Sequence, residues 1–388
     1  MKIFKDKLTL ATPILAFVIM FIFSLTLFPT VNPTPENLPV AIVNEDEGME
    51  VNNQGSINIG ETMVKNIREA GSSTDDDEAA VKWVEVKNKE KVVEGLDNQE
   101  YYAALVIPKD FSEKQASLKT NHPANPEIDI IINQGMNAAA SSMANQMLNQ
   151  MVDQLNQQLR AQIFAELKTA DTAVSVSQAE VLAEPIAVNH QNVNAVGENS
   201  ANGNAPVSLF QPLWIAVMAI AAILFIAVNK MTVHSRKENI TIKVGQIVIG
   251  LFASLIIGFG LPWLAEDLVG MNIPSFMDTA LFLSATSFCF FLMILAVLSL
   301  LGIKGIAIFA LLLFFGAPLL SMAPEMMSSF HQTWIYSWLP MRFLVEGLRE
   351  LFYFGQSFSW DLISVQFWIG LVSIIVIFLT ALKLKPKK

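Results

Sequence analysis

The chain contains little charge and one cysteine. Charged residues make up 15% of its 388 positions, 53% are hydrophobic, and the mean hydropathy is +0.44. This composition excludes a typical soluble protein and indicates an integral membrane protein that carries one soluble domain. The net charge of −10 comes from a hydrophilic block at residues 31–208, where acids are more than twice as numerous as Lys and Arg. Nucleic acid is therefore not an expected partner.

Several kinds of chemical site have no counterpart in the sequence. Cys289 lies in an apolar run, so the hydrophilic block has no disulfide and no thiolate metal site. The four histidines are scattered, which argues against a histidine metal cluster. There is no G-x-x-x-x-G-K-[ST] loop for nucleotide hydrolysis, and no Ser/His/Asp, Cys/His or paired-carboxylate arrangement. We therefore expect no enzyme activity, no metal and no cofactor in this chain.

Six apolar windows are long enough to be membrane spans, because a helix needs about 20 apolar residues to cross a hydrocarbon core of about 30 Å. Gly316 and Pro318 interrupt the fifth window. An alternative for the first window is a cleaved signal peptide, but the run is long and no small-x-small site follows it, which favours an uncleaved anchor. The six windows are residues 8–28, 209–228, 244–264, 279–301, 306–322 and 362–382.

The distribution of basic residues predicts the orientation of the spans. Lysines precede the first window, Lys and Arg lie between the second and third, Lys304 lies between the fourth and fifth, and four lysines end the chain. By the positive-inside rule both termini are cytoplasmic and the block at 31–208 is extracytoplasmic, in a multi-pass protein of the cell membrane.

The hydrophilic block alternates between strand-like and helical patterns. Short β-branched and aromatic runs predict strands at 39–44, 81–87, 101–107 and 127–132, and helices are expected at 58–69, 89–96 and 110–118. This alternation predicts an α/β layer, so the fold class is a six-span α-helical membrane protein with an inserted extracytoplasmic α/β domain. The acidic run at 75–77 is read as a solvated loop rather than a cation site, because no EF-hand spacing follows it.

A long helix is expected at about residues 136–168, where Met and Leu recur every fourth position. Its apolar band predicts either packing on its own sheet or pairing with the same helix of a second subunit. Residues 188–207 show no periodicity and are expected to form a return linker. The expected domains are 1–30 (interfacial helix and first span), 31–208 (extracytoplasmic domain) and 209–388 (five spans).

Particular motifs resemble a known family. LPVAIVNEDEG at 38–48, GLDNQEYYAALVIPKDFSEK at 95–114, INQGMN at 132–137 and LPMRFLVEGLRELFYFG at 339–355 are similar to the YhgE/Pip (phage infection protein-like) branch of ABC-2-type membrane proteins of Gram-positive bacteria. Longer members carry a large coiled-coil insert, which is reduced here to one helix.

The resemblance implies an exporter subunit for a lipophilic or amphipathic compound, driven by a separate cytoplasmic ABC ATPase. It also implies a second permease subunit, identical or different, and contact with membrane lipid. The stretch 229–243 is the expected ATPase-coupling loop, and its candidate residues are His234, Arg236, Lys237 and Glu238. The alternative function is a non-transporting surface receptor or secretion-system scaffold that acts through its ectodomain.

A helix that begins at Pro340 is the second candidate site. Arg342, Glu346, Arg349 and Glu350 are three or four residues apart, so they share one face of this helix. One interpretation is an amphipathic helix at the outer interface with exposed ion pairs; the other is an outer lid or gate that contacts the substrate. Glu266 and Asp267 could pair with these arginines, although solvated loop acids are the simpler interpretation.

Overall fold

The computed structural model describes residues 35–51, 55–71, 79–120, 122–169 and 173–382, together with Phe17 and Met20. The chain divides into two compact units. We call Thr34–Ala195 the sheet unit, and Met1–Pro33 with Val196–Lys388 the helical unit. Apart from Phe17 and Met20, the predicted first span lies outside the described residues, as do the N-terminal basic stretch, the acidic run at 75–77 and the last six residues.

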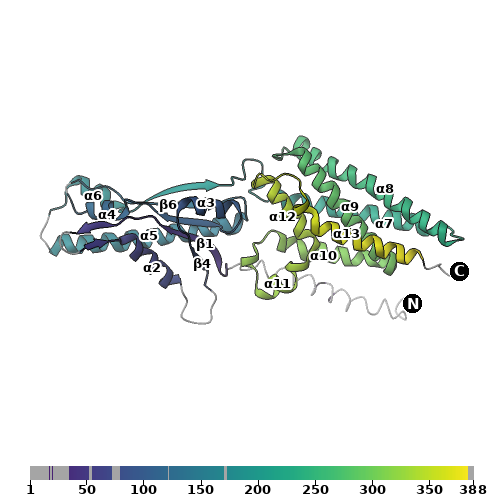
Figure 1. Cartoon of the computed structure of the whole chain (residues 1–388), viewed down its shortest axis with the longest axis horizontal. Helices are drawn as coiled ribbons and strands as arrows, with labels where there is room; N and C mark the ends of the chain where they lie inside the picture. Colours follow the sequence, from purple (N-terminus) through teal and green to yellow (C-terminus); the bar gives the residue numbers. More distant parts are fainter. Residues whose placement is uncertain are drawn as a thin grey trace, which may run out of the picture. The chain divides into compact units, whose positions relative to one another are not determined.

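The sheet unit is built on a five-stranded mixed sheet with the order β4-β1-β5-β6-β7 (Figure 1). β1 pairs in parallel with β4 and β5, β6 runs antiparallel to β5, and β7 runs parallel to β6. Four of these strands match the four predicted from sequence. The strands are β1 (Leu38–Asn44), β4 (Val81–Glu85), β5 (Ala103–Ile107), β6 (Glu127–Asn133) and β7 (Ala187–Val193), and β2 (Met49–Val51) and β3 (Gly55–Ile57) form a separate hairpin.

Helices cover both faces of the sheet, and its central strands are therefore buried on both sides. Ala41 and Val43 of β1 pack with Val92 and Leu96 of α3. The alternate residues of β1 point to the other face and are equally buried, and α5 packs against β6, β5 and β1. The helices are α2 (Ile59–Gly71), α3 (Lys89–Asp97), α4 (Phe111–Ser117), α5 (Ala138–Thr169) and α6 (Val176–Ala183).

The long helix α5 packs on its own unit along its whole length. Ala144, Leu148 and Val152 are buried in its first half. In its second half Ile163 packs with Leu118, which follows α4, and with Leu182 of α6. The structure therefore agrees with the interpretation that α5 packs on its own sheet unit. The methionines beside its buried stripe are half-buried.

The expectation of an unstructured return linker at 188–207 is wrong for its first part. Residues 187–193 form β7, whose main chain pairs with β6 over seven positions. A strand at the edge of a sheet buries only part of its surface, so it can carry polar residues such as Asn189 and His190.

The helical unit contains four stretches that are long and apolar enough to cross a membrane, among the residues that the structure describes: Ala205–Asn229, Arg236–Leu268, Phe276–Leu320 and Trp360–Ala381. The third comprises two helices joined at Gly302, where the backbone has a φ of 71°. The elements are α7 (Ala205–Asn229), α8 (Arg236–Trp263), η3 (Leu264–Leu268), α9 (Phe276–Leu301), η4 (Gly302–Gly305), α10 (Ile306–Leu320), η5 (Pro324–Met326), α11 (Ser329–Trp334), η6 (Tyr336–Trp338), α12 (Pro340–Tyr353) and α13 (Trp360–Ala381).

Gly316 and Pro318 do not interrupt the fifth predicted window. Both lie inside α10, which has 15 residues and is therefore about 22 Å long. A Cβ atom on Gly316 would lie 2.3 Å from the sulfur of Met341 in α12. This glycine therefore allows close contact between two helices rather than ending one.

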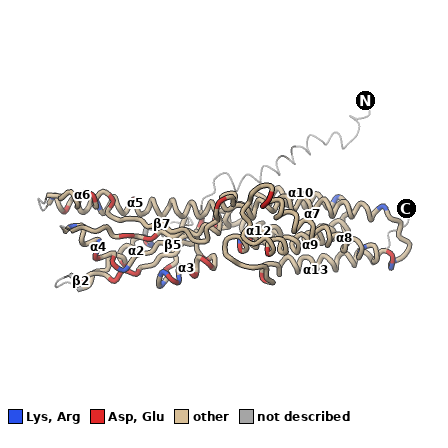
Figure 2. The backbone as a smooth tube through the Cα atoms, turned by 90° about the horizontal axis from the view of Figure 1, so that it is seen from above, with Lys and Arg blue, Asp and Glu red and all other residues tan. Residues whose placement is uncertain are grey.

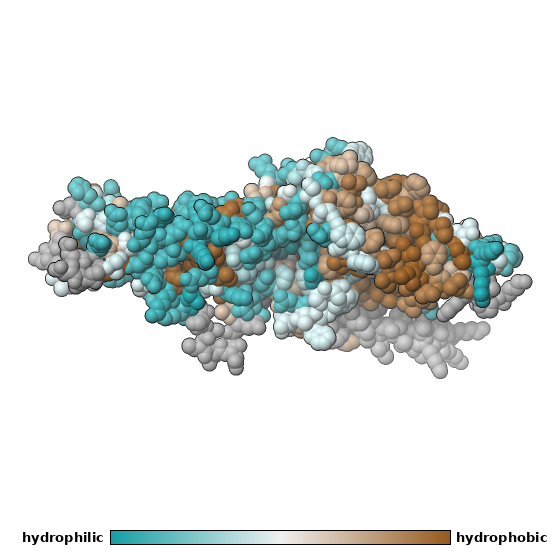
Figure 3. Space-filling model, in the orientation of Figure 1, coloured by the Kyte–Doolittle hydropathy of each residue, from teal (hydrophilic) through white to brown (hydrophobic). Residues whose placement is uncertain are grey.

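The surface of the helical unit is apolar over a broad area (Figure 3). Lys, Arg, Asp and Glu are sparse along the middle of its helices and gather near their ends (Figure 2). Many large side chains are exposed there, for example Ile256 at 74% and Phe252 at 62%. An exposed apolar surface of this kind is typical of helices that face lipid.

Candidate functional site

α12, the helix that begins at Pro340, lies among the other helices of its unit. It packs against α7, α9, α10 and α13. A Cβ atom on Gly347 would lie 2.4 Å from the ring of Phe282 in α9, so α12 and α9 are in close contact. Ten of the 14 residues of α12 are buried. The charged side chains of α12 are therefore partly enclosed by the other helices rather than freely exposed.

Two of the predicted charged residues are brought together. Arg342 and Glu346 lie 3.5 Å apart, and the hydroxyl of Tyr336 donates a hydrogen bond of 3.1 Å to the carboxylate of Glu346. The guanidinium of Arg342 donates to the carbonyl of Ser337 at 3.3 Å, and it lies 4.8 Å from the ring centre of Phe343. Burial raises the pKa of Glu346, although both arginines of α12 act in the opposite direction. Glu346 is thus half-buried and held by two neighbours.

Arg349 has a different environment. It is 8% exposed, and its Nε and Nη2 atoms have no hydrogen-bond partner among the described residues. Arg349 nevertheless acts electrostatically on Glu346, which lies one turn earlier in α12. Glu350, the neighbouring predicted residue, is half-buried. Helical spacing puts Arg349 on the same face as Arg342, but its burial depends on the surrounding helices and cannot be predicted from the spacing.

A set of polar side chains in the interior of the helical unit was not predicted from the sequence. Gln366 of α13 is fully buried, and neither atom of its amide has a hydrogen-bond partner in the described chain. The same holds for the hydroxyls of Thr279, Thr286 and Ser287 on α9 and for the amide nitrogen of Gln246 on α8. Buried polar groups are nearly always hydrogen-bonded. These five side chains, which we call the interior polar set, are therefore an exception that needs a functional explanation.

Two contacts indicate where Gln366 lies along α9. The backbone N–H of Phe358 donates to Asp278 at 3.0 Å, and a Cβ atom on Gly370 would lie 3.2 Å from the sulfur of Cys289. Both contacts join residues about 80 positions apart, so α9 and α13 run parallel in a fixed register. Gln366 is one turn before Gly370 and on the same face, which places it at the level of Thr286.

The predicted ATPase-coupling loop is shorter than expected. Only residues 230–235 are non-helical, because α8 already begins at Arg236. Ser235 caps this helix by accepting from the N–H of Glu238 at 3.1 Å, and the Glu238 carboxylate accepts from the N–H of His234 at 2.7 Å. The four predicted residues therefore form one tight turn and cap rather than a separate coupling helix.

Arg236 and Lys237 are both exposed in the first turn of α8. The positive end of the helix dipole disfavours cations at this position, so local stability does not explain them. Farther along, Asn239 donates to the carbonyl of Ala381 at 2.7 Å and so joins the start of α8 to the end of α13. The turn presents two basic side chains on a helix end that is held in place.

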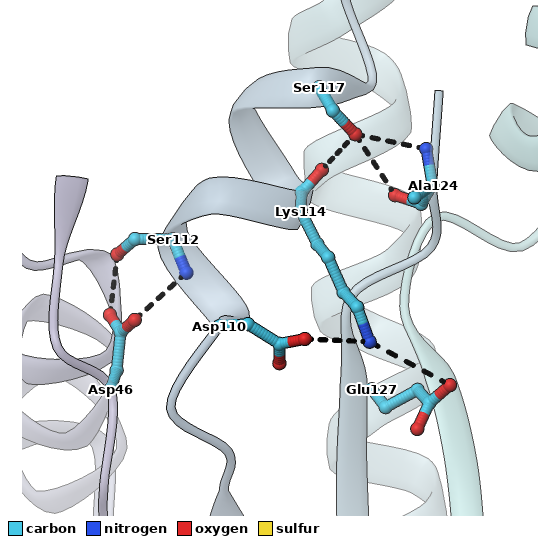
Figure 4. Close-up of polar contacts among 7 residues, drawn as sticks. All are labelled: Asp46, Asp110, Ser112, Lys114, Ser117, Ala124 and Glu127. Atoms are coloured by element: carbon cyan, nitrogen blue, oxygen red, sulfur yellow. Dashed lines mark hydrogen bonds and ion pairs between the residues drawn. The ribbon is translucent and has the colours of Figure 1, made fainter. Parts of the chain in front are cut away.

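In the sheet unit, Asp46 and Ser112, which belong to the motifs at 38–48 and 95–114, meet in a buried polar cluster (Figure 4). The Asp46 carboxylate accepts from the N–H of Ser112 at 2.9 Å, from the Ser112 hydroxyl and from the N–H of Gly60 at 3.0 Å. Ser112 and Gly60 are the second residues of α4 and α2. A Cβ atom on Gly60 would lie 2.4 Å from the Oδ1 atom of Asn44. The motif residues thus hold two helix starts against the end of β1.

A second contact in Figure 4 joins α4 to β6. Lys114 lies 3.0 Å from Asp110 and 4.0 Å from Glu127. The hydrogen bond that Lys114 donates to Asp110 raises the pKa of Lys114. Among the described residues, no group of three or more His, Cys, Asp or Glu side chains is arranged to hold a metal ion. The contacts of Lys114 therefore form part of a structural network between α4 and β6.

Comparison with known proteins relates these features to a family. A family model described as "ABC-2 family transporter protein" matches residues 7–383. The "Uncharacterized protein YhgE" of Bacillus subtilis (strain 168) is 26% identical over 104 residues, which are 27% of this chain and 12% of that relative. No solved structure matches. The family model covers nearly the whole chain, and the similarity to YhgE supports the resemblance seen in the motifs. The chain therefore belongs to the ABC-2 family of transporter proteins.

Proposed function

We propose that this chain is the permease subunit of an ABC-2-type exporter that moves a lipophilic or amphipathic compound out of a Gram-positive cell. A separate cytoplasmic ATPase supplies the energy, and two six-span permease subunits, identical or different, form the path. Family membership supports the transport role, and the predicted first span at residues 8–28 would complete the six.

The observation that carries this proposal is the interior polar set. Each unpaired polar group buried in an apolar interior costs about 1–3 kcal/mol, so packing alone does not favour these side chains. Polar residues inside membrane helices commonly mark the pathway of a substrate or ion. Gln366 and Thr286, at one level on neighbouring helices inside one subunit, would offer hydrogen bonds to a compound that enters between α9 and α13.

The two ends of the helical unit support the predicted orientation. Four exposed tryptophans lie near the end where α8 finishes and α13 begins, as expected for side chains at a membrane–water interface. The opposite end carries exposed basic residues, as expected on the cytoplasmic side. We therefore place the termini in the cytoplasm and the sheet unit outside. The tryptophans are Trp263, Trp334, Trp338 and Trp360, and the basic residues are Lys230, Arg236, Lys237 and Lys304.

The α7–α8 turn is the proposed docking point for the ATPase. Arg236 and Lys237 are exposed there, and basic side chains can pair with acids on a partner surface. The test is the double change Arg236→Glu and Lys237→Glu in cells that lack the chromosomal copy of this gene. We expect the variant to reach the membrane but to lose ATPase co-purification and the resistance to amphipathic compounds that the unchanged protein restores.

A matched control replaces Lys65 and Lys82 of the sheet unit with Glu, because both are exposed and their charge reversal is the same size. This control should keep co-purification and resistance. If the unchanged protein restores no resistance to any amphipathic compound and purifies without an ATPase, the export proposal is wrong. Loss of phage adsorption or of protein secretion in the deletion strain would then favour the receptor or scaffold function.

A further inference from the structure

The five-stranded sheet has β4 at one edge and β7 at the other, and the two edge strands differ in character. β4 has five residues, and two of them, Lys82 and Glu85, are charged and exposed. Glu85 also pairs with Arg68 of α2 at 2.7 Å. Short strands and charged side chains are common means by which a protein prevents a sheet edge from pairing with another chain. The β4 edge is therefore protected.

β7 has none of these protective features. Its seven residues, AVNHQNV, include no Lys, Arg, Asp, Glu or Pro. They pair with β6 in continuous register from Ala187 to Val193, so no bulge interrupts the strand. Asn189, His190 and Asn192 are exposed, and no strand of the described chain pairs with the outer side of β7. The main-chain groups on that side are therefore suited to pairing with another strand.

We propose that β7 pairs with β7 of a second copy of this chain, so that the two five-stranded sheets form one continuous sheet. Identical strands related by a two-fold axis run antiparallel, because the axis reverses the direction of the second strand. An axis at His190, the middle residue of β7, pairs all seven residues of both strands. Asn192 then lies opposite Val188 of the other copy.

The distribution of charge favours a second copy as the partner of β7. The sheet unit is strongly acidic, so two copies repel each other over most of its surface. β7 carries no Lys, Arg, Asp or Glu, and neither does α5 from Ala138 to Val152, which is tan in Figure 2. Asn156 of α5 bonds to both main-chain groups of Ile186, just before β7, at 3.0 and 2.7 Å. The repulsion between two acidic units is therefore weakest on this side.

This inference adds to the proposed function the surface through which two sheet units join. It rests on that function only for the expectation of two subunits. Residues 194–204 alone separate β7 from α7 in the chain, so two copies whose α7 helices share one membrane hold their β7 strands on short connections. The strand pairing itself requires no transport.

The test is disulfide formation between full-length chains in isolated membranes, in a Cys289→Ala background. Cysteine replaces each residue from Ala187 to Val193 in turn, and copper phenanthroline is added as the oxidant. Residues directly opposite on antiparallel strands have Cβ atoms about 4.5–5.5 Å apart, which is close enough for a disulfide to form. Each residue away from the axis separates the two copies of a position by about 7 Å more along the strands. The fraction of linked dimer should therefore have one sharp maximum, at His190→Cys.

A mixed experiment tests the antiparallel direction. Val188→Cys and Asn192→Cys, each with its own affinity tag, are produced in the same cells. Linked dimers that contain both tags should exceed linked dimers of either variant alone by about fivefold or more, because only the mixed pair is directly opposite. The control is Lys82→Cys, which places an exposed cysteine on the protected β4 edge. It should form no more linked dimer than the Cys289→Ala background.

Equal linkage at all positions of β7 and at Lys82→Cys would indicate random collision and overturn the inference. So would the absence of linked dimers at every position of β7, or linkage of β7 to a different protein alone. These results are separate from a failure of export, because the test needs no ATPase and no substrate. A sharp maximum at His190→Cys for a protein that exports nothing would refute the proposed function and leave the strand pairing in place.

Discussion

The carboxylate of Asp46 accepts a hydrogen bond of 2.9 Å from the backbone N–H of Ser112, 66 residues later in the chain. β1 leads to α2 and then to β4, whereas β5 leads to α4 and then to β6, and β4 and β6 lie on opposite sides of the β1–β5 pair. In open α/β sheets, a ligand commonly binds at the carboxyl ends of two such strands. Here the side chain of Asp46 takes the place that an anionic ligand would occupy.

Asp46→Asn should destabilise the sheet unit without unfolding the helical unit. The amide has one oxygen instead of two, so it cannot satisfy both Ser112 and the N–H of Gly60. Hydrogen bonds to a charged group each contribute about 1.5–3 kcal/mol, so we expect a loss of about 2–3 kcal/mol. The measurement is urea unfolding of the full chain in detergent, monitored by the fluorescence of Trp83. The other tryptophans are replaced by Phe, so that the signal comes from the sheet unit alone.

The control for this change is Glu47→Gln, one residue later. Its side chain is 70% exposed and pairs with Lys109 at 3.5 Å on the surface. Exposed pairs of this kind contribute at most about 1 kcal/mol. Equal destabilisation by both changes would show that Asp46 has no special role in joining α2 to α4.

Two glycines of α8 should respond differently to the same change. A Cβ atom on Gly258 would lie 2.4 Å from the backbone nitrogen of Ser284 in α9, whereas nothing lies within 4 Å of a Cβ atom on Gly260. Gly258→Ala should therefore force the two helices apart at a cost of about 1–3 kcal/mol. Gly260→Ala should be neutral or stabilising, because alanine favours a helix by up to about 1 kcal/mol over glycine.

The measurement is the melting temperature of both variants in detergent. It is monitored by size-exclusion chromatography of samples that have been heated to increasing temperatures. A lower melting temperature is expected for Gly258→Ala alone. If the two variants melt alike, the close crossing of α8 and α9 does not limit stability.

Strong local patterns made much of the fold predictable. β1 and β5 are runs of small and β-branched residues that are buried on both faces, and α5 has a clear helical period, so all three were predicted within a few residues. β7 was missed because an edge strand with Asn189 and His190 has no apolar alternation to detect. Its strand conformation comes from pairing with β6, which is a tertiary effect.

One contact on α12 was predictable from the sequence, but the environment of its charged residues was not. Helical spacing correctly put Arg342 beside Glu346. The sequence did not show that Arg349 would be enclosed or that Gln366 would face α9, because both depend on which helices are neighbours. Glycine at 316 and 347 was the available signal, since small residues let membrane helices approach closely.

The proposed orientation predicts a clear labelling pattern. In a Cys289→Ala background, cysteine replaces Gln158 of α5 or His234 of the α7–α8 turn, both of which are exposed. An impermeant thiol reagent should label Gln158→Cys in intact cells, and His234→Cys only after the membrane is permeabilised. Labelling of His234→Cys alone in intact cells would reverse the orientation and remove the α7–α8 turn as a docking point for the ATPase.

The half-buried carboxyl of Glu346 predicts how stability depends on pH. Burial raises its pKa above the ordinary value of 4.5, so in the window just above that value the folded state binds the proton more strongly than the unfolded state. Stability should therefore fall as the pH rises through this window and stay lower above it. Glu346→Gln, which cannot ionise, should lack this decrease and still accept the hydrogen bond from Tyr336.

The measurement is the difference in melting temperature between the variant and the unchanged protein from pH 4 to pH 8, in detergent. We expect the variant to gain relative stability as the pH rises. A constant difference for Glu346→Gln would mean that Arg342 and Tyr336 fully offset the cost of burying the charge.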